Sequence, residues 1–281
     1  MKVAVASGKG GTGKTTVATS LALAWSAAAL LDCDVEGPNA HLLFHPEVDT
    51  RRPVTVPVPR VDDDLCTRCG ECADFCRFNA LAVLPRQWMV FDQLCHSCGG
   101  CSIVCPMDAI REEPRAVGEL VLGHRDGILF AQGILREGEA QAVPVIREVL
   151  DQAPVDGLTV IDAPPGAACP MVTVVKAADV VLLVAEPTPF GRHDLEAALA
   201  AVDELDIPAG VLINRADWGA EAARDLCRRH GVPVLLEIPH LREVAEAYSN
   251  SRPLIESAPQ LREPLLRLRE RLLELAGRRA A

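Results

Sequence analysis

The sequence predicts an α/β fold, in which a mostly parallel sheet is flanked by helices and interrupted by a small inserted α+β unit. Short apolar runs alternate with helical patterns over most of the 281 residues, as in parallel sheets covered on both faces. Residues 61–115 break this alternation and contain eight of the eleven cysteines. The hydrophobic fraction of 49% is sufficient for a sizeable core. We therefore divide the chain into a first core segment (1–60), an insertion (61–115) and a second core segment (116–281).

The expected elements follow in order along the two core segments. Residues 2–6 read as a strand, and a glycine-rich loop, a helix and a second strand ending at Asp32 come after it. The residues between Arg51 and Arg60 are rich in Pro and Val and are expected to be extended. The later elements are a hairpin over 119–135 that turns at 124–127, a helix near 142–152, strands at 158–161, 180–184, 210–213 and 233–237 with helices between them, and two C-terminal helices.

Composition excludes several classes of protein. The formal net charge of -11 argues against general nucleic-acid binding, which needs clustered Lys and Arg. The sequence has no apolar run of about eighteen residues and no signal peptide, so we expect a cytoplasmic protein. The leucines of the last helix are expected to pack on the core rather than on a membrane, because Glu263, Glu270 and Glu274 share its polar face. Without a secretion signal, the cysteines indicate metal or redox chemistry.

The first loop matches a phosphate-binding pattern. Residues 8–15 fit G-x-x-x-x-G-K-[ST], with a strand before and a helix after. Glycines allow backbone N–H groups to turn toward phosphate oxygens, while Lys14 reaches the β- and γ-phosphates and Thr15 offers its hydroxyl to Mg²⁺. The sequence therefore predicts an ATP site. Its expected loop contacts are Gly8, Gly10, Gly11, Thr12, Gly13, Lys14, Thr15 and Thr16.

The second lysine of the loop, Lys9, makes the motif resemble the deviant Walker A form of the MinD/Mrp/ParA and nitrogenase iron-protein class of ATPases. The resemblance implies that Lys9 reaches the nucleotide of a partner subunit, so that ATP is held between the two chains of a homodimer. It also implies an ATPase, which we expect to be slow and stimulated by a partner. From the residues alone, Lys9 is only a second cation near the phosphates.

Acidic and polar residues after later strands fit the same site. Asp34 is placed to orient the attacking water or contact the metal, and Asp162 to hold Mg²⁺ through water. Each could instead be a turn or N-cap residue. The resemblance assigns Lys9, Lys14, Asp34 and Asp162 to catalysis. It implies that Gly166 senses the γ-phosphate, and that Asn214, Arg215 and Pro239 lie around the base.

The clustered cysteines form a duplicated motif. Cys66-x2-Cys69-x2-Cys72-x3-Cys76 is repeated as Cys95-x2-Cys98-x2-Cys101-x3-Cys105-Pro106. The spacing resembles that of bacterial ferredoxins with two [4Fe–4S] clusters, in which the fourth cysteine ligates the other cluster. The resemblance implies one set of Cys66, Cys69, Cys72 and Cys105, and another of Cys95, Cys98, Cys101 and Cys76. Zinc is the competing interpretation, because paired C-x2-C motifs also bind it.

Three cysteines lie outside these motifs. We expect Cys33 and Cys227 to be buried and inert. Cys169 follows Asp162 by seven residues, where the nitrogenase iron protein has a cluster ligand. That cluster needs a second cysteine from each subunit, and none is evident here, so a structural role is the favoured interpretation.

Three functions are consistent with these motifs. In the first, ATP gates a dimer and couples its nucleotide state to electron transfer through two [4Fe–4S] clusters toward an unidentified redox partner. In the second, the protein assembles or carries iron–sulfur clusters for an acceptor protein. In the third, it is a MinD-like positioning ATPase whose clusters are structural or sensory.

Overall fold

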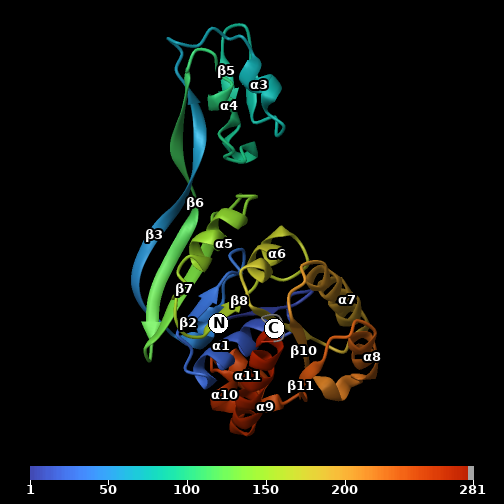
Figure 1. Ribbon diagram of the computed structural model, residues 1–281. Coiled ribbons are helices and arrows are strands. Elements are labelled where there is room, and N and C mark those ends of the chain that lie inside the picture. Colours follow the sequence, from blue (N-terminus) through green and yellow to red (C-terminus); the bar gives the residue numbers. More distant parts are fainter. Residues whose placement is uncertain (278–281) are drawn as a thin grey trace.

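A central twisted sheet organises the protein. The computed structural model describes residues 1–277, and over these the main sheet has nine strands in the order β11-β10-β9-β1-β8-β2-β7-β6-β3 (Figure 1). The strands from β11 to β7 are mutually parallel, whereas β6 and β3 run antiparallel to their neighbours. The bounds are β1 (Lys2–Ala6), β2 (Ala29–Asp32), β3 (Glu47–Val61), β6 (Ile110–Arg125), β7 (Ile128–Leu135), β8 (Thr159–Asp162), β9 (Val180–Ala185), β10 (Ala209–Asn214) and β11 (Val234–Ile238).

Helices cover both faces of this sheet. One face packs against a layer that contributes Val145, Met171, Leu199 and Leu226 to a single apolar cluster. Its helices are α5 (Val143–Leu150), α6 (Cys169–Lys176), α7 (Pro189–Glu204) and α8 (Glu221–Arg229). The opposite face packs against α1 (Lys14–Ala24), α2 (Ala40–Phe44), α9 (Arg242–Ser249), α10 (Leu254–Ser257) and α11 (Arg262–Gly277).

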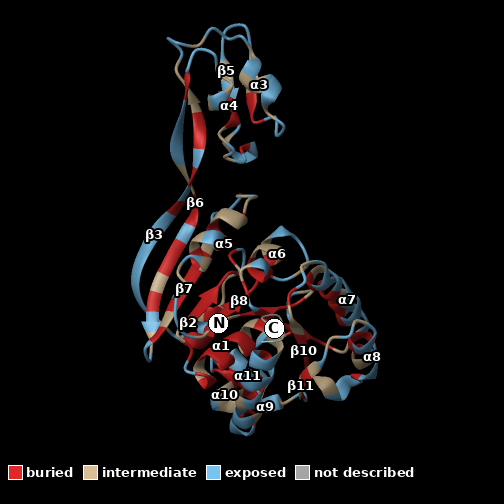
Figure 2. Cartoon of the chain, in the orientation of Figure 1, coloured by how far each residue is buried: buried red, intermediate tan, exposed pale blue. Residues whose placement is uncertain are grey.

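The central strands are buried because they contribute to both clusters. In β1, Ala4 and Ala6 face one layer, whereas Val3 and Val5 face the other. This is the alternation that a pleated strand imposes, and it explains why these strands read as continuous apolar runs. Figure 2 shows the resulting buried band through the middle of the sheet. The predicted mostly parallel sheet flanked by helices is confirmed.

The two antiparallel strands form an arm that carries the cysteines away from the sheet. β6 pairs with β7 only as far as Gly118 opposite Leu135, but its pairing with β3 continues to Ile110 opposite Val61. Eight residues of β6 therefore extend beyond the carboxyl end of β7, which is about 25 Å of strand. Because β1 is parallel to β7 through its neighbours, the arm projects past the edge from which the glycine-rich loop emerges (Figure 1).

β3 suits this exposed position. Prolines at 53, 57 and 59 lack an N–H group and are tolerated because β3 is an edge strand. Val54, Val56 and Val58 alternate with them and are buried. At the far end, Arg60 donates two hydrogen bonds to Asp92, at 2.7 and 2.8 Å, which tie the arm to the unit that it carries.

The cysteine unit occupies residues 62–109, between the strands of the arm. It contains the helices α3 (Glu71–Phe75) and α4 (Gly100–Ile103) and a two-stranded sheet of β4 (Leu81–Val83) and β5 (Trp88–Val90). Residues 110–115, assigned from sequence to the insertion, lie in β6. The duplicated motif is repeated in the backbone, because positive φ angles recur 29 residues apart at Arg68 and Ser97, Gly70 and Gly99, and Asn79 and Asp108.

Two further expectations can be compared with the structure. The hairpin is confirmed, with Asp126 and Gly127 at its turn and both at positive φ. Within residues 1–277, three α-helices follow β11 instead of the two predicted, because Pro253 and Pro259 interrupt the helical run. The leucine stripe of α11 is buried, and the indole N–H of Trp25 donates to the Leu265 carbonyl at 2.8 Å. None of the helices within residues 1–277 combines the length and apolarity needed to cross a membrane.

Candidate functional site

The glycine-rich loop connects β1 to α1 and forms a backbone cradle at the helix N-terminus. Gly13 is the N-cap residue with φ of 93°. A Cβ at Gly13 would lie 2.6 Å from Nδ2 of Asn214, so glycine is required by both conformation and space. That amide donates to the Thr12 carbonyl at 2.8 Å. The loop is thus held open by β10 while its N–H groups remain available for an anion.

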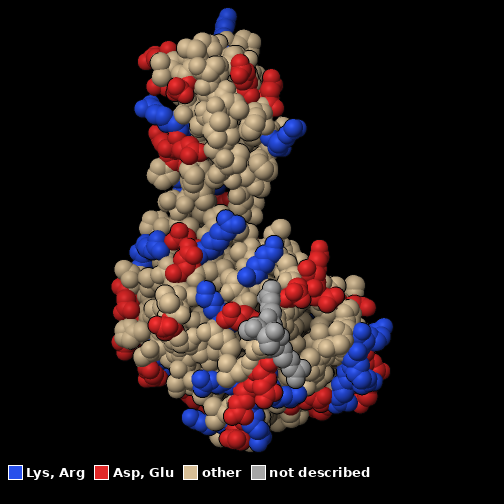
Figure 3. All heavy atoms as spheres, viewed as in Figure 1, with Lys and Arg blue, Asp and Glu red and all other residues tan. Residues whose placement is uncertain are grey.

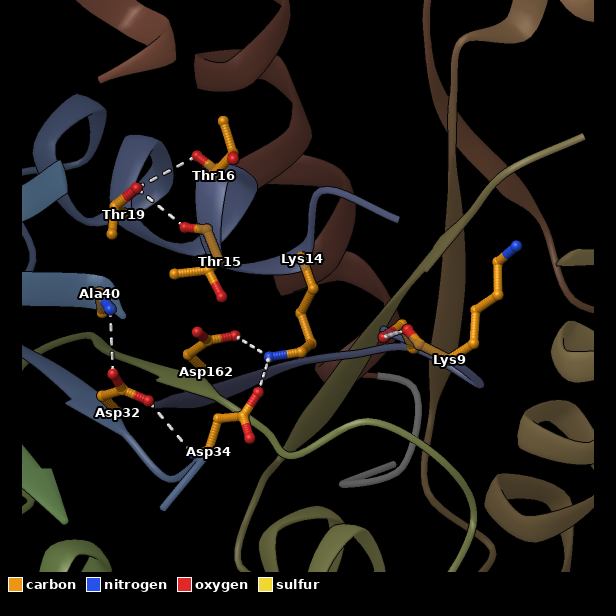
Figure 4. Close-up of polar contacts among 10 residues, drawn as sticks. Lys9, Lys14, Thr15, Thr16, Thr19, Asp32, Asp34, Ala40 and Asp162 are labelled. Atoms are coloured by element: carbon orange, nitrogen blue, oxygen red, sulfur yellow. Dashed lines mark hydrogen bonds and ion pairs between the residues drawn. The ribbon is translucent and has the colours of Figure 1, made fainter. Parts of the chain in front are cut away.

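Lys14 is buried between two carboxylates. Its Nζ lies 2.6 Å from Oδ1 of Asp162 and 3.5 Å from Oδ2 of Asp34, and all three side chains converge in Figure 4. Burial lowers the pKa of Lys14, but Asp162 and Asp34 outweigh it, so the pKa stays above its usual value. Burial raises the pKa of Asp34, with Lys14 opposing the effect. The Lys14 ammonium is therefore already paired with both predicted acids.

Polar atoms near these groups remain unpaired. Among the described residues, neither Oδ2 of Asp162 nor Oγ1 of Thr12 has a hydrogen-bond partner, although both atoms are buried. Such orphaned oxygens are costly unless a ligand satisfies them. Asp162 ends β8, beside the start of α1, where Thr15 lies. A divalent cation bound with nucleotide phosphates fits this donor set of carboxylate and hydroxyl oxygens.

Asp32 is a residue of this site that the sequence analysis did not assign. Its Oδ1 accepts from the Asp34 N–H at 3.1 Å, and its Oδ2 accepts from the Ala40 N–H at 3.0 Å. It thereby fixes the loop that presents Asp34. Burial, together with the nearby charge of Asp162, raises the pKa of Asp32 to about 8. In the sequence, the D-x-D pattern of residues 32–34 at the end of β2 was the signal that could have identified Asp32 as a site residue.

A cleft of about 390 Å³ that opens to solvent lies beside the loop. Asn214, Arg215 and Pro239 line it as expected from the resemblance, together with Lys9, Lys14, Thr15 and Asp34. Gly166, at φ of 96°, lies against the loop and donates its N–H to the Ser7 carbonyl at 2.9 Å. The cleft is also lined by Val244, Ala245 and Tyr248 of α9 and by Leu241 just before it, none of which was predicted from sequence.

The Lys9 side chain does not lie beside that of Lys14. Figure 4 shows its side chain directed away from the cluster of Lys14, Asp34 and Asp162. Its Nζ lies 3.3 Å from Oε2 of Glu186, and the other oxygen of Glu186 is paired with Arg215. Glu186 is buried, whereas the Lys9 side chain is 28% exposed.

The clustered cysteines surround two separate cavities. One cavity, of about 20 Å³, is lined by Cys66, Cys69, Cys72 and Cys105. The other, of about 60 Å³, is lined by Cys76, Cys95, Cys98 and Cys101. We call these the first and second cysteine sets. They are the two groups of four that the sequence motifs implied.

The thiols of both sets are held by similar local geometry. The N–H of Ala80 donates to Sγ of Cys76 at 3.4 Å, and the N–H of Ala109 donates to Sγ of Cys105 at 3.3 Å. Within residues 1–277, no three His, Cys, Asp or Glu side chains converge closely enough for a single metal ion. Burial raises the pKa of Cys72, Cys95 and Cys101, so binding of a metal group would displace protons from these thiols.

The other cysteines are dispersed. Cys33 and Cys227 are buried, as expected. Cys169 is exposed at the first position of α6, close in sequence to Asp162 and Gly166.

The loop, the helix behind it and the carboxylates at the ends of β2 and β8 define a P-loop nucleotide-binding protein. Residues 3–254 match the family described as CobQ/CobB/MinD/ParA nucleotide binding domain. The chain belongs to this family.

Relatives with the same architecture cover nearly the whole chain. The uncharacterized protein MJ0578 of Methanocaldococcus jannaschii is 32% identical over 275 residues, which are 94% of this chain and 96% of that protein. Among solved structures, the septum site-determining protein MinD of Pyrococcus horikoshii, complexed with Mg-ADP, has a TM-score of 0.59 at 18% identity and covers 98% of this chain and 97% of its own. The cell division ATPase MinD of Pyrococcus furiosus has a TM-score of 0.57 at 19% identity, covering 97% and 99%. The predicted MinD-type fold is thereby confirmed.

Proposed function

We propose that this protein is an ATP-driven switch that holds two [4Fe–4S] clusters and couples its nucleotide state to electron transfer. The observation that carries the proposal is the position of the cysteine unit. Both strands of its arm belong to the sheet that holds the P-loop, and the arm projects past the nucleotide edge of that sheet. A change at that edge can therefore be transmitted to the cysteines.

ATP binding and hydrolysis are supported by the family and by the site. The MinD/ParA-type fold is consistent with ATP hydrolysis, and a MinD relative was solved with Mg-ADP. In this chain Lys14 would neutralise phosphate charge, Thr15 and Asp162 would hold Mg²⁺, and Asp34 would orient the attacking water. Binding of the nucleotide must first separate Lys14 from its carboxylates. This makes the segments that carry them sensitive to phosphate, and we call residues 34–39 after β2 the first switch segment and residues 162–166 at the end of β8 the second.

We infer iron–sulfur clusters rather than zinc from the arrangement of the two cysteine sets. Each set places four thiols around a cavity, and backbone N–H groups already point at Cys76 and Cys105. A structural zinc ion would instead require four sulfurs about 2.3 Å from one point. When bound, each cluster would accept and release one electron. The chain's own contribution is to ligate, to donate N–H···S bonds and to limit solvent access, all of which tune reduction potential.

The proposed active state is a homodimer with ATP between its subunits. Lys9 lines the cleft and is partly exposed, and within residues 1–277 its side chain forms an ion pair only with Glu186. Its release would allow it to reach the nucleotide of a second copy of the chain.

A redox partner would dock on the cysteine unit. Cys69 and Cys98 are exposed, so each set approaches the surface. Figure 3 shows broad uncharged areas on this part of the molecule. Its exposed large apolar side chains are Leu65, Phe75, Phe78, Leu84, Met89, Phe91, Leu94, Ile103 and Met107.

The cluster content is tested by anaerobic reconstitution followed by iron, sulfide and zinc analysis. We expect about eight iron and eight sulfide per chain. Cys66→Ser and Cys101→Ser should each lower both values to about half, because they belong to different sets. Tight binding of zinc in place of iron would overturn this part of the proposal. Transfer of intact clusters to an apo-acceptor, with no effect of ATP on their redox state, would favour the carrier function instead.

A further inference from the structure

One side chain from the loop that precedes α5 contacts the second cysteine set directly. Gln141, just before α5, donates from Nε2 to the Cys95 carbonyl at 2.8 Å. Gln141 is half-buried, and Cys95 is buried. Two residues after Cys95, Ser97 donates its N–H to Sγ of Cys95 at 3.4 Å. The Gln141 bond therefore holds the same short turn that directs a hydrogen bond to the ligand sulfur.

The two cysteine sets differ in their relation to the core. Cys95 and Ala80 belong to the apolar cluster that also includes Ala142 and Val145 at the start of α5, and Cys76 packs against it. Cys72 and Cys105 instead pack against a small separate cluster of Leu81, Cys101 and Ile110, which Cys76 also contacts. The second set therefore reaches the core of the ATP-binding fold through Cys95 and Cys76, whereas no member of the first set within residues 1–277 belongs to that core cluster.

A short chain of contacts connects Gln141 to the nucleotide site. Asp34 is 3.5 Å from Lys14, and the carbonyl of the following residue, Val35, accepts from the Leu135 N–H at 2.8 Å. Leu135 ends β7, and residues 136–142 lead directly from it to Gln141 and α5. We call residues 136–142 the coupling loop.

The coupling loop is stiffened along its length. Arg136 donates its N–H to the Val117 carbonyl of the arm at 3.0 Å. The Glu139 side chain, only 2% exposed, pairs with Arg115 of the arm at 2.5 Å and accepts from the Gln141 N–H at 3.3 Å. Because these bonds restrain the coupling loop, a displacement at Val35 moves the loop as a unit and is not absorbed within it.

The second switch segment reaches the same place. Asp162 and Gly166 precede α6, and α6 packs against α5. Val145 and Val149 of α5 also surround Gly133, next to Val35. Both segments that would respond to the γ-phosphate therefore bear on α5 and on the coupling loop.

From these contacts we propose that Gln141 is a positioning residue that transmits the nucleotide state to the second cysteine set. The inference rests on the proposed function and names the set on which ATP acts. Loss of the Lys14–Asp34 pair on nucleotide binding moves Val35, the coupling loop follows through Leu135, and Gln141 moves the Cys95 turn. The first set responds only through the arm.

The test measures backbone hydrogen exchange in the reconstituted protein, with MgATP, with MgADP and without nucleotide. Peptides covering 95–101 and 66–76 report on the two sets separately. Gln141→Leu removes the donor at similar size. Gln152→Leu is the matched control, because Gln152 makes a comparable side-chain bond, to the Glu148 carbonyl at 3.0 Å, just beyond the far end of α5. Fluorescent-nucleotide binding verifies that each variant still folds and binds ATP.

In the wild type we expect MgATP to change the rate of backbone hydrogen exchange in residues 95–101 by about fivefold or more. Fivefold is about the lower end of the range that is typical of coupling between two sites. Gln141→Leu should reduce that change to less than about twofold while nucleotide affinity stays unaltered, and Gln152→Leu should retain it. Gln141→Ala, which adds no branched chain, provides the same comparison if the leucine variant fails to bind ATP.

Two results would overturn the inference, and they differ in what else they overturn. If Gln141→Leu and Gln141→Ala keep the full response, Gln141 does not transmit the nucleotide state, and the proposed function stands. If the wild type binds ATP but shows no response in either peptide, the coupling in the proposed function fails as well.

Discussion

Replacing Glu186 by Gln should strengthen ATP-dependent dimerisation. Glu186 lies 3.3 Å from Lys9, and Lys9 must leave it to reach a partner's nucleotide. With Lys9 28% exposed, the pair contributes about 0.5–1 kcal/mol, the upper part of the range for partly exposed ion pairs. That energy corresponds to about two- to fivefold per subunit. Because two lysines are released in a symmetric dimer, the dimer Kd should fall by about five- to thirtyfold.

Sedimentation velocity over a range of protein concentrations, with MgATP and with MgADP, measures this change. Glu237→Gln is a suitable control, because Glu237 pairs with Arg224 at 2.7 Å, on the neighbouring β11–α8 contact, and does not contact Lys9. We expect Glu237→Gln to behave as the wild type. An unchanged or weaker ATP-dependent dimer for Glu186→Gln would refute the idea that Glu186 restrains Lys9.

Three further predictions follow from the site and the core. Lys14→Ala should weaken nucleotide binding by about a hundredfold or more, since it removes a charged phosphate contact, and calorimetry would detect retained affinity as a contradiction. Leu268→Ala should lower the free energy of unfolding by about 2–5 kcal/mol in urea titrations, because Leu268 is 1% exposed, whereas Leu273→Ala, at a site 44% exposed, should have little effect. The pKa of Asp32 is raised to about 8 in the folded chain. Its contribution to stability is therefore fully present below the unfolded pKa of about 4 and is lost as pH rises to about 8, a slope that should be absent in Asp32→Asn.

Local patterns in the sequence were sufficient to predict most of the parallel sheet and the P-loop. Apolar runs located β8, β9, β10 and β11, because strands buried on both faces need no polar alternation. The turn at Asp126 and Gly127 could also be predicted, since both positions need positive φ.

Features that depend on distant pairing could not be read from sequence. The arm exists because β3 pairs with β6 across the whole cysteine unit, and nothing in the Pro- and Val-rich run specifies that partner. Tyr248 lines the cleft because of how α9 packs, in contact with α10, and no local pattern specifies that packing. Gln141 carries no motif, and its contact with Cys95 arises from the meeting of two segments 46 residues apart.

The site residues also divide into those that local sequence patterns predict and those that they do not. Lys14, Asp34 and Asp162 were assigned from their places after strands, and parallel strands necessarily bring such residues to one edge. Asp32 was not assigned, because a side chain that hydrogen-bonds the backbone of its neighbours leaves no sequence pattern beyond D-x-D.

The coupling of nucleotide to clusters is tested most directly by an EPR-monitored redox titration of the reconstituted protein, with and without MgATP. A coupling free energy of about 1 kcal/mol or more corresponds to a shift of about 40 mV or more in a one-electron midpoint potential. We predict such a shift for at least one cluster of the wild type and none for Lys14→Ala. Identical potentials with MgATP, with MgADP and without nucleotide would contradict the proposal that ATP controls electron transfer in this protein.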